Sequence, residues 1–339
     1  MSKIQIGVIG SGAVGSIIAT KLTYIGYDVE YVYDKQSDIV IDGKQEMSVV
    51  GGSCSCSALV TCVAKEEDFS TKKDIIFLAC KSTHMQAHAK KIKNALTDNG
   101  FVVMLNNTLC RHCVTPYIPI NKIVGMFIEW SCVKIDYDDS EITNAGPTIF
   151  GTYNQDAKPL AELTCKIMEP ISHSTYVDNL NDIVLGRIIL NSAIASVGAI
   201  SGLNLGEFLK LKYGRKLFVE LIKEGVSVYR HVDIKAEDYD KKLNYDLFCS
   251  DTFKGKIYRR QIINFLIKYN GQTRSSILQD LQNNKSIEAE YLIGKIVETG
   301  NKHNINCKFS EKVYKKIIEI QENNDTIRPE LLKIIYTRK

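Results

Sequence analysis

The stretch "IQIGVIGSGAVGSIIATKL", residues 4–22, carries glycines at positions 10, 12 and 15 between two apolar runs. The first run is short and rich in β-branched residues, which is typical of a buried strand. The second run has apolar residues at helical spacing and ends near Gly26, a residue type that often terminates helices. The stretch therefore predicts a strand, a glycine-rich turn and a helix.

A second strand, predicted over "YDVEYVYD" (residues 27–34), completes a strand–helix–strand unit of the kind that binds dinucleotides. In such a unit the first glycine allows the tight turn, the second lets a pyrophosphate approach the backbone, and the third lets the helix pack on the sheet. The helix N-terminus offers unpaired N–H groups to the phosphates. The alternative is a glycine turn without a ligand. We predict a cofactor-binding loop formed by Gly10, Ser11, Gly12, Ala13, Val14 and Gly15.

Asp34 closes this predicted second strand. A carboxylate at that place accepts hydrogen bonds from the ribose hydroxyls and repels a 2′-phosphate, so it favours NADH over NADPH. Two alternatives stay open: the neighbouring Lys35 offsets the repulsion, or Asp34 is an ordinary solvated residue of a turn.

Further strand patterns follow in "ALVTCVA", "DIIFLAC" and "FVVMLNN", with a helical pattern over residues 81–96 between the last two. This alternation predicts an α/β domain with a doubly wound, mostly parallel sheet. Lys81 and Asn107 follow strand ends, where such sheets bind ligands, so both are candidate cofactor-binding residues. Each could instead cap a neighbouring helix.

From about residue 180 onward the patterns are helical only. We therefore predict two domains, a dinucleotide-binding Rossmann domain over 1–180 and an all-α domain over 181–339 for substrate binding and dimerisation. The sequence does not decide whether the chain forms a homodimer.

Two predicted helices carry polar residues among mostly apolar ones. Arg187 and Asn191 lie four residues apart, on one face of an otherwise apolar or small helix. Ser286 is expected to cap another helix, with Glu288 in its first turn, where the helix dipole favours an anion. Arg187 and Glu288 are either site residues or a structural ion pair between helices.

Composition limits the function classes. The 43 basic and 39 acidic residues are interspersed and leave a formal charge of only +4, unlike the clustered basic patch of nucleic-acid-binding proteins. Apolar runs such as "DIIFLAC" are too short to cross a bilayer, and the N-terminus does not resemble a signal peptide. We expect a cytoplasmic protein without a nucleic-acid or membrane partner.

The ten cysteines are expected to be reduced thiols. Cys110, His112 and Cys113 suggest a metal or redox site, but the second ligand pair that zinc needs is missing, since Cys54 and Cys56 form only a C-x-C. No metal is predicted.

These motifs together resemble the ketopantoate reductase family, the 2-dehydropantoate 2-reductases, over nearly the whole chain. "GVIGSGAVGS" suits the glycine loop of that family, "LACKSTH" places its cofactor-side lysine on Lys81, and "LNNTL" places its asparagine on Asn107. "EITNAGPTIFGTYN" (residues 141–154) resembles the hairpin that finishes the first domain. The most specific match is "SSILQDLQNNKSIEAEYLIG", which maps the substrate-side serine and glutamate onto Ser276 and Glu288.

The resemblance implies NAD(P)H-dependent reduction of a small 2-keto acid in a cleft between the domains, as in the conversion of 2-dehydropantoate to pantoate in pantothenate biosynthesis. It implies catalytic roles for Arg187 and Glu288, with Arg187 at the position of the general-acid lysine of the family. It implies substrate-binding roles for Asn191, Ser276 and, after a one-residue shift, Asn204.

Several positions depart from the family pattern. Arg187 stands where the family has a lysine, and Ala195 stands where it has a polar residue. Thr108 stands in place of a glycine, and Asp34 stands in place of the arginine of NADP-dependent members. Two alternatives therefore stay open, a different 2-keto acid substrate or a dinucleotide-binding sensor or scaffold without turnover. The retained Asn191, Ser276 and Glu288 favour the enzyme.

Overall fold

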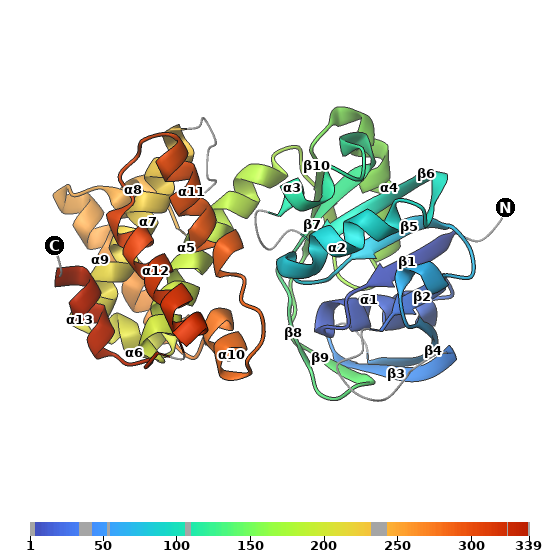
Figure 1. Cartoon of the computed structure of the whole chain (residues 1–339), viewed down its shortest axis with the longest axis horizontal. Coiled ribbons are helices and arrows are strands. Elements are labelled where there is room, and N and C mark those ends of the chain that lie inside the picture. Colours follow the sequence, from blue (N-terminus) through green and yellow to red (C-terminus); the bar gives the residue numbers. More distant parts are fainter. Residues whose placement is uncertain are drawn as a thin grey trace. The chain divides into compact units, whose positions relative to one another are not determined.

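The computed structural model describes residues 4–33, 43–52, 55–105, 110–231, 243–323 and 325–337. The chain divides into two compact units, Met1–Leu180 and Asn181–Lys339. The first contains a mixed sheet with four helices, and the second is helical (Figure 1). Asp34 and Asn107, two of the predicted cofactor-binding residues, lie outside the described residues, as do Lys35 and Thr108.

The first unit is built on one sheet of eleven strands in the order β11-β10-β7-β6-β5-β1-β2-β4-β3-β9-β8. Most neighbouring strands are parallel, and the antiparallel pairs are β7–β10, β3–β4 and β8–β9. The strands are β1 (Gln5–Ile9), β2 (Asp28–Val32), β3 (Gly43–Gly51), β4 (Cys56–Val63), β5 (Lys73–Leu78), β6 (Leu96–Leu105), β7 (Ile123–Ile128), β8 (Ser131–Lys134), β9 (Asp139–Asn144), β10 (Thr148–Thr152) and β11 (Ser174–Tyr176).

The helices of this unit are α1 (Ala13–Tyr24), α2 (Ser82–Ile92), α3 (Arg111–Val114) and α4 (Lys158–Met168). The connections β1–α1–β2 and β5–α2–β6 step across the sheet in opposite directions, so right-handed crossovers place α1 and α2 on opposite faces. Ile17 of α1 and Ile167 of α4 share a buried core with Val8 and Phe77 of the central strands. The predicted doubly wound, mostly parallel sheet is confirmed.

Residues 141–154 do not form the expected hairpin, and that prediction is wrong. β9 pairs with β3 and β8, whereas β10 pairs with β7 and β11 in another part of the sheet. Between them, Pro147 has no N–H to donate to a ladder. Its carbonyl oxygen accepts a hydrogen bond from the Glu129 N–H instead, over 2.9 Å. The segment therefore crosses from one sheet region to the other.

The second unit is helical, as predicted. Its helices are α5 (Leu180–Ser201), α6 (Leu205–Lys210), α7 (Lys212–His231), α8 (Tyr245–Cys249), α9 (Phe253–Asn270), α10 (Ser276–Gln282), α11 (Ile293–Lys302), α12 (Lys308–Asn323) and α13 (Glu330–Thr337). Helix α11 begins later than expected. Leu292 breaks the helical path with φ −108° and ψ −100°, so Glu288 precedes a 3₁₀ turn over Ala289–Tyr291 and does not lie in the first turn of an α-helix.

Helix α5 is long and apolar enough to cross a membrane by length and composition alone. The expectation that the apolar runs are too short to cross a bilayer does not hold for this helix, in which Asp182 and Arg187 interrupt a longer apolar sequence. In the structure 78% of its most apolar window is buried. Gly225 of α7 packs against Ile189, where an added Cβ would lie 3.3 Å from that side chain. Helix α5 is thus a core helix of its unit.

Candidate functional site: a glycine loop and a polar helix face

The glycine loop connects β1 to α1 at the carboxyl edge of the central strands. Gly10 has φ +125°, and a Cβ there would lie 2.5 Å from the Ala79 carbonyl oxygen. A Cβ on Gly15 would lie 2.0 Å from the Gly10 carbonyl oxygen. Both positions therefore exclude any larger residue for reasons of packing within the unit.

Gly12 differs from its two neighbours. A Cβ on Gly12 would meet nothing within 4 Å among the described residues, so the fold itself does not require a glycine here. Gly12 is also the N-cap of α1 and, as a glycine, has no side chain that could cap the helix. The first N–H groups of a helix lack partners within the helix, and the N-cap of α1 has open space beside its Cα. This arrangement suits the diphosphate of a dinucleotide, which binds by close approach to such N–H groups.

The loop lies beside the second predicted cofactor segment. The Ala79 N–H donates a hydrogen bond to the Ile9 carbonyl oxygen over 2.8 Å, so the chain after β5 runs alongside the loop. Lys81 follows two residues later, half-buried, as the N-cap residue of α2. The structure therefore brings Lys81 to the edge of the sheet that carries the glycine loop.

Two side chains hold the carbonyl oxygens of the loop from outside it. The hydroxyl of buried Tyr31 donates to the Gly10 carbonyl oxygen over 3.3 Å. The Lys134 ammonium donates to the Ser11 carbonyl oxygen over 2.8 Å and lies 4.7 Å from the centre of the Tyr33 ring. These bonds hold two carbonyl groups of the loop in place and thereby restrict the orientation of the loop backbone.

Lys134 is a residue that the sequence interpretation missed. It ends β8 in an edge hairpin with β9, and no local motif marks it. Burial lowers the pKa of the Lys134 ammonium, although Asp138, Cys62 and Asp136 act in the opposite direction. Burial also raises the pKa of Tyr33 to about 12, with Asp138 adding to the shift. Lys134 is thus a desolvated cation next to the end of β2, the strand that precedes Asp34.

In the second unit, Arg187 and Asn191 lie on α5 as predicted, with Arg187 half-buried and Asn191 exposed. One turn further along α5, the Ala195 carbonyl oxygen accepts a hydrogen bond from the Ser275 hydroxyl over 2.6 Å. Ser275 is the buried N-cap of α10 and also accepts from the Leu278 N–H. Exposed Ser276 therefore starts a helix that is fixed to α5 one turn from Asn191.

Asn204 caps helix α6, and Glu288 precedes a 3₁₀ turn. Asn204 is the N-cap of α6, where its side-chain oxygen accepts from the Glu207 N–H over 2.9 Å and its own N–H donates to the Glu207 carboxylate. This capping box explains the presence of Asn204 by its contribution to the stability of α6. The substrate-binding role of Asn204 stays a prediction. Glu288 is half-buried before the 3₁₀ turn.

The cysteines of the described chain are free thiols. Cys110 contacts the Met85 sulfur at 3.3 Å, and Cys113 lies 3.6 Å from His112. Among the described residues, no group of three or more His, Cys, Asp or Glu side chains could hold a metal ion.

Comparison with known proteins assigns both units to one family. The model "Ketopantoate reductase PanE/ApbA" matches residues 6–155, and "Ketopantoate reductase PanE/ApbA C terminal" matches residues 179–321. A 2-dehydropantoate 2-reductase of Archaeoglobus fulgidus is 23% identical over 311 residues, which cover 89% of this chain and 93% of the relative.

Solved structures show the same fold. A PanE/ApbA family ketopantoate reductase from Ralstonia eutropha has a TM-score of 0.79 at 18% identity, covering 94% of this chain and 99% of that one. D-mandelate dehydrogenase with NADH and anilino(oxo)acetate has a TM-score of 0.76 at 15% identity, also with 94% and 99% coverage.

Proposed function

Since this chain belongs to the ketopantoate reductase family, we propose that it reduces a small 2-keto acid to the 2-hydroxy acid with NAD(P)H, and that ketopantoate is the substrate. The observation that supports this most is the glycine loop, in which Gly12 alone leaves space for a ligand while Gly10 and Gly15 serve packing. Such a loop at a helix N-terminus is a binding place for a dinucleotide diphosphate.

In this proposal, the glycine loop and the N-terminus of α1 hold the diphosphate, and Lys81 lies on the cofactor side. The nicotinamide supplies the hydride when bound. NADH is the preferred cofactor, because the Asp34 carboxylate repels a 2′-phosphate.

The residues of the second unit act on the keto acid. The Arg187 guanidinium stabilises the negative charge that develops on the substrate oxygen or binds the substrate carboxylate, with the bidentate geometry that arginine offers. Asn191, Ser276 and Glu288 orient the hydroxyl and carboxylate groups. An arginine stays charged at neutral pH and is a poor proton donor, so the proton comes from water or from the Lys81 ammonium.

The test is a panel of branched 2-keto acids, ketopantoate included, followed through the loss of NADH or NADPH absorbance. We expect turnover with ketopantoate, and light scattering to show a homodimer. Turnover of another keto acid only would replace the substrate and keep the reaction class. Binding of the dinucleotide without turnover of any keto acid would favour a sensor or scaffold.

A further inference from the structure

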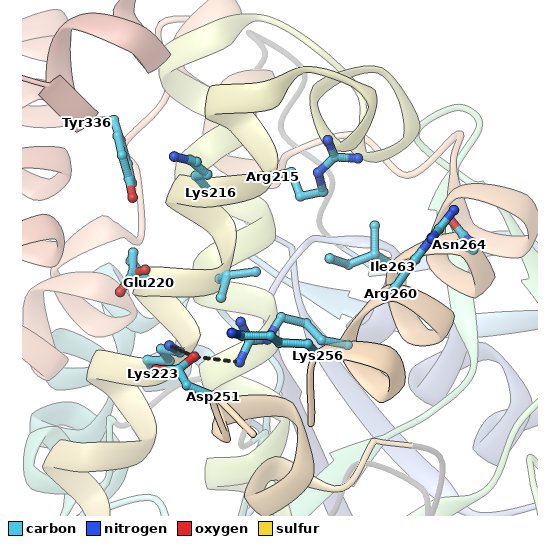
Figure 2. Close-up of a pocket in the computed structure, with 12 residues that line it drawn as sticks. Arg215, Lys216, Glu220, Lys223, Asp251, Lys256, Arg260, Ile263, Asn264 and Tyr336 are labelled. Carbon is cyan, nitrogen blue, oxygen red and sulfur yellow. Dashed lines mark hydrogen bonds and ion pairs between the residues drawn. The ribbon is translucent and has the colours of Figure 1, made fainter. Parts of the chain in front are cut away.

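A hollow in the second unit lies apart from every predicted site residue. It has a volume of about 790 Å³ and is lined mainly by α7 and α9, with Tyr336 from α13 (Figure 2). Arg187, Asn191, Asn204, Ser276 and Glu288 do not line it. Volumes of this size are typical of pockets for small ligands.

The charge of the lining is one-sided. Its two acidic residues are Glu220 and Asp251, and its six cationic residues are Arg215, Lys216, Lys223, Lys256, Arg259 and Arg260. The whole chain is nearly balanced, so this excess is local. Arg215, Lys256 and Arg260 are exposed, and like charges gathered at one place repel one another, so a bound anion relieves that repulsion.

One acidic residue is already neutralised. The Asp251 carboxylate accepts from Lys223 over 2.7 Å and from Arg259 over 3.2 Å, and these hydrogen bonds, Lys223 first, lower the pKa of Asp251. Arg259 also donates to the Phe248 and Ser250 carbonyl oxygens, each over 2.7 Å. This network forms a fixed edge of the hollow, drawn at the bottom of Figure 2.

The remaining cations are available to a ligand. Among the residues that the structure describes, Arg215, Lys256 and Arg260 have no carboxylate at ion-pair distance. Lys216 lies 5.1 Å from the centre of the Tyr336 ring. Figure 2 shows Glu220, the second acidic residue, on the Tyr336 side of the hollow and Arg260 on the opposite side. An anion bound near Arg215, Lys256 and Arg260 is therefore separated from the carboxylate of Glu220.

The floor of the hollow is rigid. Val219 of α7 is 7% exposed and Ile263 of α9 is 4% exposed, so both helices are anchored in the core beneath the charged side chains. Two arginines and a lysine on anchored helices suit phosphate, because guanidinium groups bind its oxygens bidentately. The net excess of four positive charges favours a ligand with more than one phosphate group over a single phosphate.

We propose that this hollow binds a small molecule carrying two or more phosphate groups, held by Arg215, Lys256 and Arg260. The site is independent of the proposed reductase activity. An acidic protein segment or a nucleic acid is a larger partner that would use the surface around the hollow instead of its interior.

The test is isothermal titration calorimetry of sodium tripolyphosphate into the full chain without added dinucleotide, because NADH and NADPH themselves carry two or three phosphate groups. Binding at the glycine loop instead would survive substitutions in the hollow and would overturn the proposal. The probe variant is Arg215→Gln/Arg260→Gln. The matched control is Lys254→Gln/Lys268→Gln, which removes the same charge from exposed positions of α9 outside the hollow. If the double variant fails to fold, the single Lys256→Gln takes its place.

We expect one binding site, with a Kd that rises about tenfold or more in the probe variant and about twofold or less in the control. Equal weakening in both variants would overturn the proposal, because it would indicate unspecific attraction. No binding of tripolyphosphate, or binding only of heparin or RNA, would also overturn it.

Discussion

The Lys134 ammonium donates a hydrogen bond to the Ser11 carbonyl oxygen over 2.8 Å, across 123 residues of chain. Because Ser11 lies between Gly10 and Gly12, this bond connects the edge hairpin β8–β9 to the loop proposed to hold the cofactor. The direction of the loop N–H groups therefore depends on a residue far from the loop in sequence.

Replacing Lys134 with Met should raise the KM for NADH and for NADPH by about tenfold, because a hydrogen bond from a charged donor is lost from the loop backbone. The kcat should change little, since Lys134 is not among the residues proposed to act on the keto acid. Lys44→Met, at an exposed position of β3, is the control and should leave both KM values unchanged. A KM increase for NADPH alone would contradict a role through the loop and indicate contact with the 2′-phosphate.

The pH dependence of cofactor binding should follow the protonation of Lys134. Burial lowers the pKa of Lys134, so the ammonium loses its proton at a lower pH than an ordinary lysine. Above that pH the bond to Ser11 is no longer charge-assisted, and kcat/KM for the cofactor should fall. Tyr33, with a pKa raised to about 12, titrates later. In Lys134→Arg the fall should disappear, because arginine keeps its charge; an unchanged profile in that variant would assign the fall to another group.

Gly12→Ala should separate binding from folding. A Cβ at this position meets no described atom within 4 Å, so the melting temperature should stay the same. The added methyl group would lie where the diphosphate approaches, and the Kd for the dinucleotide should rise about tenfold or more. Gly15→Ala is the matched comparison: its Cβ would lie 2.0 Å from the Gly10 carbonyl oxygen, and it should lower the melting temperature. Unimpaired dinucleotide binding by Gly12→Ala would place the cofactor elsewhere.

Arg187→Lys should raise kcat with ketopantoate. A positioned general acid contributes roughly 10²–10⁴-fold in rate, and a lysine can donate the proton that an arginine holds. Arg187→Gln, which removes the charge, should lower kcat/KM. Stopped-flow and steady-state kinetics of the three proteins measure this. Fast turnover by the wild type together with a slower Arg187→Lys would mean that the arginine already serves the reaction well.

The sequence was informative where local pattern and fold agree. The strand, the glycine turn and helix α1 follow from β-branched residues, three glycines and apolar spacing over one short stretch. Helix α5 likewise follows from the helical pattern of residues 181–200 and spans Leu180–Ser201 in the structure. In these segments neighbouring residues determine the structure.

Long-range pairing could not be predicted in the same way. Residues 141–154 have two strand-like runs around a turn, and only the positions of β3 and β7 decide that the runs join different neighbours. Lys134 reaches Ser11 only because β8 and β9 extend the sheet beside α1. The start of α11 depends on the backbone angles of Leu292, which no pattern of residue types reveals.

The most direct test of the proposed activity is the transfer of deuterium from the cofactor. The chain is incubated with ketopantoate and with NADH or NADPH deuterated at C4 of the nicotinamide, on one face or the other, and the product acid is analysed by mass spectrometry and NMR. We predict pantoate that carries deuterium at C2 with one of the two labelled faces and not with the other. Oxidation of the cofactor without deuterium in the acid, or dinucleotide binding with no product from any 2-keto acid, would contradict the account.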